Sequence, residues 1–238
     1  MSKNNLISII IPAYNKSEEL RTCLASVFQQ NYPAFEVIAV NDGSTDNTVH
    51  ILEEYKHKFW QKNIRFKIIQ QNNQGAQMAR NRGLREARGA FLIFWDADVV
   101  ASPQMMTKMH AALQNHSDAS YAYASFTYGK KKFKLWDFDK EKLKQMPCIH
   151  TTTLIKYDDF PGKWNTSVDR LQDWDMFLTM LEKDKIGVFV PEFLFTVLTD
   201  HGTMSSWLPK VAYKFMPWHE NVKKYQNAVA VIKKKHGL

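Results

Sequence analysis

Two aspartates follow the most apolar run of the chain, residues 91–95. An unbroken apolar run of this kind is typical of a strand buried on both faces. Asp96 and Asp98 point the same way if the strand continues through them, and they crowd one loop if it stops at Trp95. Carboxylates that converge at a strand end most simply hold a hard cation, so we expect Mg²⁺ or Mn²⁺, with coordination positions left for substrate phosphates. The alternative is a polar loop with two solvated acids.

The composition bounds the class of protein. The 238 residues, 45% hydrophobic and 24% charged, suffice for one sizeable α/β domain. Two cysteines, Cys23 and Cys148, make neither a disulfide framework nor a zinc-finger spacing, which indicates a reducing compartment. No apolar run reaches the roughly 18 residues of a spanning helix, and the start of the chain lacks the layout of a signal peptide. We therefore expect a cytoplasmic protein, or one held peripherally on the inner face of the cell membrane.

Strands and helices are expected to alternate over the first hundred residues. Apolar runs predict strands at residues 7–11, 36–40, 66–69 and 91–95, and helical spacing predicts helices from Ser17, around residues 49–55 and over residues 76–87. This alternation implies right-handed crossovers and a mostly parallel sheet. Ligands of such sheets bind beyond the carboxyl ends of the strands. The sequence therefore predicts one crevice lined by residues near 14, 42, 75 and 96.

The second half of the chain is less regular. We expect a helix capped by Ser102 with Pro103 at its first position, strands at residues 121–128, 149–155 and 188–198, an exposed ribbon at 130–134 and a helix starting near Asp169. No repeat or linker divides it. The prediction is one α/β domain over residues 1–206, with a nucleotide-binding half (1–100) and an acceptor-side half (101–206), followed by a basic, aromatic, helical tail (207–238).

Five motifs together resemble one known family. They are Pro12-Ala13-Tyr14-Asn15, Val40-Asn41-Asp42-Gly43-Ser44-Thr45-Asp46, Asn73-Gln74-Gly75 with Ala79-Arg80-Asn81-Arg82-Gly83, Asp96-Ala97-Asp98, and Gln172-Asp173-Trp174-Asp175. Their order and spacing over about residues 6–206 are similar to those of family 2 glycosyltransferases. The resemblance implies a Rossmann-like GT-A fold, a nucleotide-sugar donor and transfer with inversion.

The resemblance also implies a donor site. A carboxylate at Asp42 can accept a hydrogen bond from the N–H of uracil, which favours a UDP-sugar, and Arg80 can reach the pyrophosphate as a charged fork. Tyr14 can stack on the base. Alternatively, Asp42 is a turn residue, Tyr14 packs in the domain and Arg80 is solvated. The expected donor-binding residues are Pro12, Ala13, Tyr14, Asn15, Asp42, Gly75, Arg80 and Asp96.

The same resemblance assigns the metal and the base. It makes Asp98 the direct metal ligand, places Asp96 at the ribose or a metal-bound water, and puts His201 near the metal or the diphosphate, unless His201 is only polar surface. The family's base, which takes a proton from the acceptor hydroxyl, corresponds to Asp173. Asp175 is the second choice, and a helix cap is the alternative role for either acid. Gln172 departs from the glutamate that relatives often have.

The tail leaves several uses open. After residue 209 there are seven lysines and one acid, so six of the eight net positive charges lie there. Val211, Phe215, Trp218, Val222 and Tyr225 fall roughly on one helical face, which suits either contact with an anionic membrane or packing on the domain, with a kink at Pro217. A membrane would present a lipid-linked acceptor.

Two other functions remain as alternatives. A sugar nucleotidyltransferase also uses acidic metal ligands, but its basic glycine-rich loop after the first strand is missing. Nucleic-acid binding through the basic tail is a non-enzymatic alternative that we do not expect. For the leading function we expect a glycan or lipid-linked saccharide acceptor in cell-surface polysaccharide synthesis, with residues 130–136 and His150 at the rim of its site.

Overall fold

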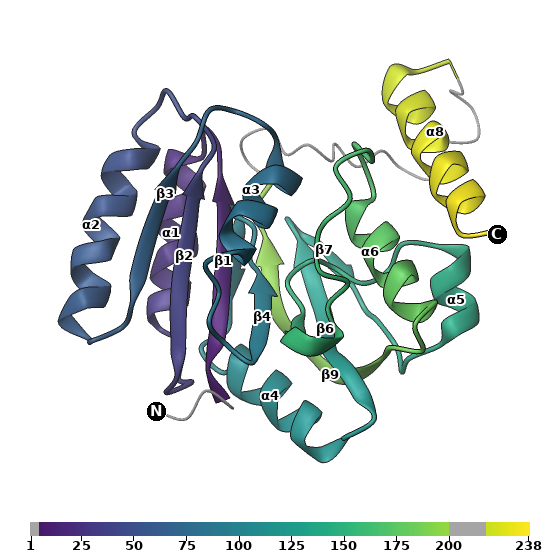
Figure 1. Ribbon diagram of the computed structural model, residues 1–238, viewed down its shortest axis with the longest axis horizontal. Helices are drawn as coiled ribbons and strands as arrows, with labels where there is room; N and C mark the ends of the chain where they lie inside the picture. The colour runs from purple at the N-terminus through teal and green to yellow at the C-terminus, as the bar shows by residue number, and fades with distance from the viewer. Residues whose placement is uncertain (1–4, 200–217) are drawn as a thin grey trace.

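The computed structural model describes residues 5–199 and 218–238, which build one nine-stranded sheet flanked by helices (Figure 1). The strand order is β3-β2-β1-β4-β8-β6-β9-β5, and β7 pairs with β6. The strands are β1 (Ile7–Ala13), β2 (Phe35–Asn41), β3 (Phe66–Gln70), β4 (Phe91–Phe94), β5 (Val99–Ala101), β6 (Ala119–Tyr128), β7 (Lys131–Phe133), β8 (Leu154–Lys156) and β9 (Ile186–Val197). The helices are α1 (Ser17–Phe28), α2 (Thr48–Gln61), α3 (Ala76–Leu84), α4 (Met105–Asn115), α5 (Lys140–Gln145), η2 (Tyr157–Asp159), α6 (Gln172–Leu181) and α8 (Glu220–Lys235).

The first half confirms the predicted parallel α/β arrangement. Strands β3, β2, β1 and β4 are neighbours and all parallel, and the helix between each pair supplies the crossover. Helix α1 buries Leu20, Cys23, Leu24 and Val27, the spacing of an amphipathic helix. Helices α1 and α2 lie behind the sheet and α3 in front of it in Figure 1. The carboxyl ends of β1, β2 and β4 therefore meet at one edge, as predicted.

Strand β1 is longer than expected because Pro12 and Ala13 continue it. Trp95 N donates to Ile10 O, so the backbone of Ile10 faces β4, and the nitrogen of Pro12, two residues on, faces the same side. The paired part of β4 has ended there, and Pro12 therefore leaves no ladder hydrogen bond unmade. On the other side Pro12 still pairs in register with Val40 of β2.

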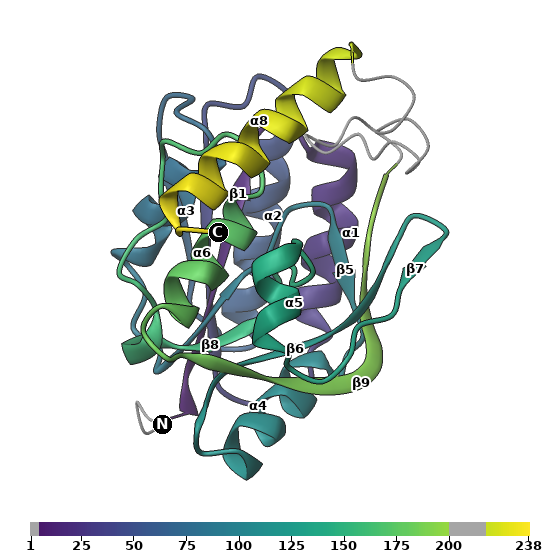
Figure 2. The ribbon, with the colours of Figure 1, turned by 90° about the vertical axis from the view of Figure 1, so that its right-hand side faces the viewer.

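The second half adds strands of both directions. Strand β8 is antiparallel to both β4 and β6, β9 runs parallel to β6, and the short β5 pairs antiparallel with β9. Figure 2 shows β9 as a long curved strand crossing the molecule, with the β6–β7 hairpin at the right edge of the view. Since the second half includes these antiparallel pairs, the sheet is mostly rather than wholly parallel.

Several predicted boundaries in the second half differ from the structure. The strand expected over residues 149–155 is confined to β8, because residues 149–153 form an irregular segment in which Thr153 N donates to Thr151 O. The helix expected at Ser102 begins at Met105, and the Ser102 hydroxyl accepts a hydrogen bond from Gln104 N in the turn before it. The helix expected near Asp169 begins at Gln172.

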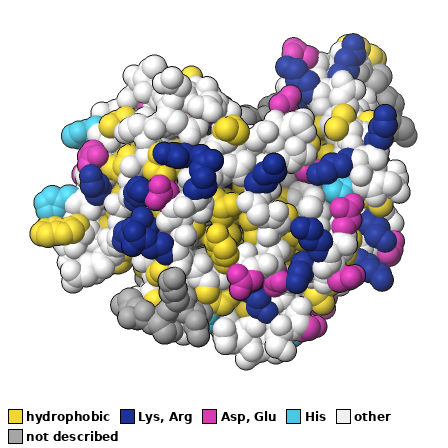
Figure 3. All heavy atoms as spheres, in the orientation of Figure 1, with side chains coloured by type: hydrophobic (Ala, Val, Ile, Leu, Met, Phe, Trp, Pro, Cys, Tyr) yellow, Lys and Arg dark blue, Asp and Glu magenta, His cyan; other side chains and the backbone are white. Residues whose placement is uncertain are grey.

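The described part of the tail packs on the domain. Helix α8 buries Val222 and Ile232, and half-buried Val229 packs against the core. Its lysines mostly face solvent, and no helix among residues 5–199 and 218–238 combines the length and apolar character needed to span a bilayer. The expected positions Val211, Phe215 and Pro217 lie outside the described residues. On the face shown in Figure 3, basic and acidic side chains are mixed rather than gathered in one basic patch.

Candidate active site

The acidic pair lies in a tight turn between β4 and β5. Trp95 is fully buried, and its Nε1 donates to Val99 O at 3.0 Å, while Val99 N donates to Asp96 O at 3.0 Å. These bonds close the turn. Asp96 and Asp98 are therefore crowded into one short loop, which is the second of the two predicted arrangements.

Asp96 is held by partners that favour its charged form. Arg80 Nη2 donates to Oδ1 at 2.6 Å, and the Thr151 hydroxyl donates to Oδ2 at 2.8 Å. Burial alone would raise the pKa of Asp96, but the charge of Arg80 and these two hydrogen bonds outweigh it and hold the pKa below its ordinary value. Asp96 is a fixed carboxylate whose two oxygens are already engaged.

Asp98 has the opposite surroundings. Its burial, and next the charge of Asp96, raise its pKa to about 7. A carboxyl group that is costly to ionise alone becomes a good ligand when a cation neutralises it, and a hard divalent ion that takes few protein ligands fits this position. Within residues 5–199 and 218–238, no three His, Cys, Asp or Glu side chains cluster as a complete metal site. The remaining oxygens would come from substrate phosphates and water; His201 lies outside the described residues.

Asp42 organises the loops at the ends of β1 and β2. Its Oδ1 accepts hydrogen bonds from Gln71 Nε2 at 2.7 Å and Gln74 N at 2.9 Å, and its Oδ2 accepts one from Gly75 N at 2.8 Å. A carboxylate can accept about four hydrogen bonds, so one position remains for a ligand. Gly75 has φ +89°, which a side chain would disfavour, and it begins the turn into α3. Asp42 thus fixes the entry of α3 as well as offering an acceptor.

The loop after β1 lies beside the loop after β2. Asn15, with φ 48°, places its Oδ1 to accept from Thr45 N at 2.8 Å, and its own N donates to the Ser44 hydroxyl at 3.0 Å. Asp46 joins the same pair of loops by accepting from Ser17 N and Thr48 N, so it caps two helices. Tyr14 is 46% exposed, so its ring is available to a ligand rather than packed in the core.

Arg80 is buried, which differs from the solvated alternative. It is 4% exposed, its guanidinium lies 4.7 Å from the Trp164 ring centroid, and it pairs with Asp96. Its Nε and Nη1 atoms are buried and have no hydrogen-bond partner among the described residues. Gly83, three residues further along α3, allows this helix to pack closely on β1, because a Cβ there would lie 2.5 Å from Ile10 Cγ2. In this arrangement Arg80 positions Asp96, which the sequence did not predict.

Asp173 lies in the first turn of α6 with few ties to the protein. Its Oδ1 accepts a hydrogen bond from Trp174 N at 2.9 Å. Burial raises its pKa to about 6, and the charges of Arg80 and Asp96 also act on it, which places it beside the acidic turn. An acid with this pKa is mostly ionised at neutral pH and basic enough to take a proton.

Asp175 is excluded as the base by its partners. It is 2% exposed and faces Lys235 Nζ, His236 Nε2 and Asn165 Nδ2 at 2.7, 3.0 and 3.1 Å from its nearest oxygens. Two residues apart on a helix, Asp173 and Asp175 point to different sides. The charges of Arg80 and Asp96 act on Asp173, whereas Asp175 anchors the end of α8.

Sequence reasoning missed two supporting residues, Thr151 and Trp164. Both lie in irregular segments that carry no periodic signal. The run of threonines at 151–153 offered the one visible hint. His150, predicted at the acceptor rim, packs against Phe126 and Phe195 at 5.3 and 5.2 Å between centroids, and its Nδ1 accepts from Thr152 N, so the neutral ring carries its proton on Nε2.

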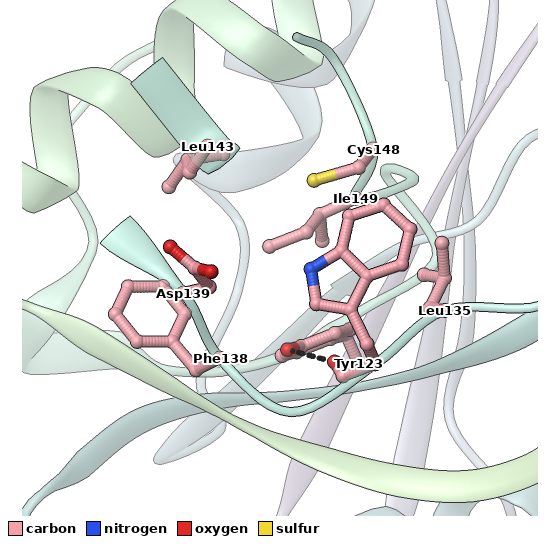
Figure 4. Close-up of a pocket in the computed structure, with 8 residues that line it drawn as sticks. Tyr123, Leu135, Phe138, Asp139, Leu143, Cys148 and Ile149 are labelled. Atoms are coloured by element: carbon pink, nitrogen blue, oxygen red, sulfur yellow. Dashed lines mark hydrogen bonds between the residues drawn. The ribbon is translucent and has the colours of Figure 1, made fainter. Parts of the chain in front are cut away.

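Neither of two hollows in the described structure is a substrate site by itself. Figure 4 shows a small pocket with Leu143 of α5 on one side and Cys148 and Ile149 on the other; its volume of about 10 Å³ suits a single water. Burial raises the pKa of Cys148 to about 11, and the neighbouring Asp173 also raises it, which places this pocket next to the candidate base. The larger hollow, about 560 Å³ between Trp60 of α2 and Phe66 of β3, lies at the opposite end of the strands.

Comparisons with known proteins agree with this geometry. The family model described as Glycosyl transferase family 2 matches residues 8–170. The uncharacterized glycosyltransferase YibD of Escherichia coli is 38% identical over 129 residues, which cover 54% of this chain and 36% of YibD. The aligned residues span about a third of the length of YibD and of two further curated relatives, EpsH and EpsJ of Bacillus subtilis.

Solved structures show the fold. Staphylococcus aureus TarS 1–349 in complex with UDP-GlcNAc has a TM-score of 0.71 at 19% identity, covering 97% of this chain and 72% of that one. The mannosyltransferase PcManGT from Pyrobaculum calidifontis, in complex with GDP-Man and Mn²⁺, has a TM-score of 0.66 at 14% identity, covering 98% and 76%. The predicted GT-A fold is confirmed.

Proposed function

The chain belongs to glycosyl transferase family 2, and we propose that it is a metal-dependent, inverting glycosyltransferase that moves a sugar from a UDP-sugar to an acceptor hydroxyl. The observation that carries the proposal is that carboxyl groups with different pKa values lie close together at one end of the sheet. Asp96 is held charged, Asp98 is ready for a cation, and Asp173 has a pKa of about 6 beside them. Neighbouring carboxyl groups whose environments give them different pKa values can serve one site as a ligand and as a base.

Asp98 would hold the divalent ion, with His201 as a proposed second protein ligand. Bound there, Mn²⁺ or Mg²⁺ would supply Lewis-acid stabilisation of the leaving diphosphate. Arg80 and Thr151 keep Asp96 in one orientation, so its carboxylate can face the ribose without rearrangement. The neighbour PcManGT, which carries Mn²⁺ in its structure, supports the cation.

The nucleoside would lie over the loops after β1 and β2. The Asp42 position left open can accept the N–H of uracil, Tyr14 can cover the base, and Pro12, Ala13 and Asn15 supply the backbone beneath. The UDP-GlcNAc complex of TarS supports a UDP-sugar donor. Gly75 completes this donor site because its N–H fixes Asp42.

Asp173 would act as the general base. Its carboxylate takes the proton of the acceptor hydroxyl as the oxygen attacks the anomeric carbon from the side opposite the diphosphate, which inverts the configuration. Its hydrogen bond from Trp174 N engages Oδ1, and we propose that Oδ2 receives the acceptor. The proximity of Arg80 stabilises the ionised form without pairing with it.

The acceptor we propose is a glycan or a lipid-linked saccharide of the cell surface. TarS is named as a poly(ribitol-phosphate) beta-N-acetylglucosaminyltransferase, which supports a cell-surface polymer. We also propose that the reaction occurs on the cytoplasmic side of the membrane, where the exposed lysines Lys223 and Lys234 of α8 can approach anionic headgroups.

The experiment is a donor panel. The protein is incubated with UDP-GlcNAc, UDP-glucose, UDP-galactose and GDP-mannose, each with Mn²⁺ or with a chelator, and release of the nucleoside diphosphate is measured. We expect release from at least one UDP-sugar and only with the metal. With an acceptor, Asp173→Asn should lower transfer by about 10²–10⁴-fold while UDP binding stays unchanged. Asp169→Asn, at an exposed acid nearby, is the control. Turnover by Asp173→Asn equal to that of the control would refute the base.

A further inference from the structure

The β6–β7 hairpin concentrates positive charge in five consecutive residues. Four of residues 130–134 are lysine, the fifth is Phe133, and all four lysines are exposed. Lys130, Lys132 and Lys134 pair with no carboxylate in the part of the chain that the structure describes. Like charges this close raise the free energy of the folded protein. A bound polyanion would offset that cost.

The strand register places this hairpin level with the acidic turn. Lys131 pairs with Tyr128 of β6, Tyr128 with Val197 of β9, and Val197 with Val99 of β5, the residue after Asp98. Three strand spacings of about 4.8 Å separate the backbones of Lys131 and Val99 by about 14 Å along the sheet. The end of β9 also connects the two ends of this row, because Leu198 N donates to Asp98 O and Gly129 N donates to Val197 O. The hairpin therefore lies a few sugar or polyol units from the reaction centre.

A rigid row of aromatic rings fills the space between them. Phe133, Phe126 and Phe195 stack across β7, β6 and β9 at 4.9 and 5.2 Å with planes 4° and 3° apart. His150 closes the row against Phe126 and Phe195, and Thr151 next to it bonds Asp96. The hairpin is thus held at a fixed distance from the acidic turn rather than tethered by a flexible loop.

Two of the four lysine ammonium groups lie over aromatic rings. Lys131 Nζ lies 4.7 Å from the centroid of Phe133, and Lys132 Nζ lies 5.6 Å from that of Phe193, which is 43% exposed. These contacts stiffen long side chains and lower the entropy lost when an anion binds. Lysines serve as point charges for phosphate, and several spaced along one edge suit a chain of separate phosphates better than a single group.

We propose that the β6–β7 hairpin, residues 129–134, binds the phosphodiester groups of the acceptor, a polyol- or sugar-phosphate chain whose terminal unit reaches Asp173. The inference rests on the proposed function and adds the chemical class of the acceptor. Lysines on an edge strand have another explanation, protection of β7 against pairing with a second sheet. Edge protection requires no ligand, so a binding measurement distinguishes the two explanations.

The test measures binding of a fluorescent glycerol-phosphate oligomer by anisotropy, with saturating UDP and Mn²⁺ so that the donor site is filled. Lys130→Ala/Lys132→Ala/Lys134→Ala is compared with the wild type and with Lys223→Ala/Lys233→Ala/Lys234→Ala, which removes the same charge from α8. We expect the hairpin variant to bind at least about tenfold more weakly and with less salt dependence, the α8 variant to stay within about twofold of the wild type, and a neutral dextran oligomer not to bind.

Three results would overturn the proposal. Unchanged binding by the hairpin variant would leave edge protection as the role of these lysines. Equal loss by both variants would show attraction to overall charge. Loss of sedimentation with phosphatidylglycerol vesicles by the hairpin variant, with oligomer binding intact, would make the hairpin a membrane contact. Stabilisation of the hairpin variant by UDP and Mn²⁺, measured separately, reports on the donor site, so failure of the proposed function is seen independently.

Discussion

At the residue scale, Asp96 and Asp98 are two residues apart in one turn yet favour different charge states. Arg80 and Thr151 keep Asp96 ionised. Asp98 is buried next to that charge, which raises its pKa to about 7. Asp96 is therefore ionised without a cation, whereas Asp98 ionises readily at neutral pH only when a cation binds it. A cation that binds Asp98 has to displace a proton whenever the pH is near or below 7.

This competition gives a pH dependence of metal binding. The affinity for Mn²⁺ in the presence of UDP should rise with pH up to about 7 and level off above it, because the pKa of Asp98 is raised and its proton is lost there. Titration calorimetry at pH 6, 7 and 8 in buffers of different ionisation enthalpy measures both affinity and proton release. An affinity that is constant from pH 6 to 8, without proton release, would contradict the role of Asp98.

Asp173 predicts a second and separate titration. Its raised pKa, about 6, means that it loses its proton as the pH rises through 6, and only the ionised form can accept the acceptor's proton. The rate of transfer at saturating metal should fall about tenfold per pH unit below 6. An initial-rate profile from pH 5 to 8 measures it, and a rate that increases toward pH 5 would rule out a carboxylate base.

At the element scale, helix α6 bears two acids, Asp173 and Asp175, that have different roles. Asp173 faces the acidic turn, while Asp175 receives Lys235 and His236 from the end of α8. His236 also approaches Glu182 Oε1 at 2.6 Å through Nδ1, so both ring nitrogens face carboxylates. We call Asp175, Glu182, Lys235 and His236 the C-terminal clasp. It ties α8 to the helix that bears the candidate base.

Breaking the clasp should lower stability and spare the donor site. Asp175→Asn keeps the shape but removes the charge from a buried cluster, and we expect a loss of about 1–3 kcal/mol, a fall in Tm of roughly 2–10 °C for a chain of this size. Thermal unfolding with and without UDP and Mn²⁺ measures it, with Asp169→Asn as the matched surface control. A Tm equal to that of the control would show that the clasp contributes nothing.

The stability that the C-terminal clasp contributes should be lost at acidic pH. Burial raises the pKa of Asp175, but hydrogen bonds from Lys235, His236 and Asn165 outweigh it and leave the pKa below its ordinary value of about 3.9. A carboxylate with a lowered pKa contributes stability above its unfolded pKa and loses it as the pH falls through the folded one. The contribution of Asp175 is therefore fully present at neutral pH.

The elements themselves were predictable where the pattern repeats. Apolar runs followed by helical spacing identified β1 to β4 and the three helices between them, because β1, β2 and β4 are buried on both faces, β3 buries Phe66 and Ile69, and each helix buries one face. Pro12 was misleading, because its missing N–H matters only where a neighbouring strand is present, and β4 has already ended there. The irregular segment around Thr151 could not be predicted, since its conformation follows from its bond to Asp96 and not from local preference.

At the scale of the whole molecule, a parallel half presents the loops of the proposed donor site, and a mixed half presents the candidate base and the hairpin. The two halves join through β4 and β8, and the acidic turn leads from β4 to β5, which pairs with β9. That Asp42 and Asp96 follow parallel strands at one edge was predictable from motifs and alternation. The order β6-β9-β5 was not, because pairing of strands so far apart in the chain leaves no local signal.

The central claim is that Asp98 makes donor binding depend on a divalent cation, while Asp173 acts only in transfer. The most direct measurement is calorimetric titration of UDP into wild type, Asp98→Asn and Asp173→Asn at pH 7.5, each with Mn²⁺ and with chelator. We predict that Mn²⁺ strengthens UDP binding by tenfold or more in wild type and Asp173→Asn, and that this gain is lost in Asp98→Asn. An equal gain from Mn²⁺ in Asp98→Asn would contradict the account.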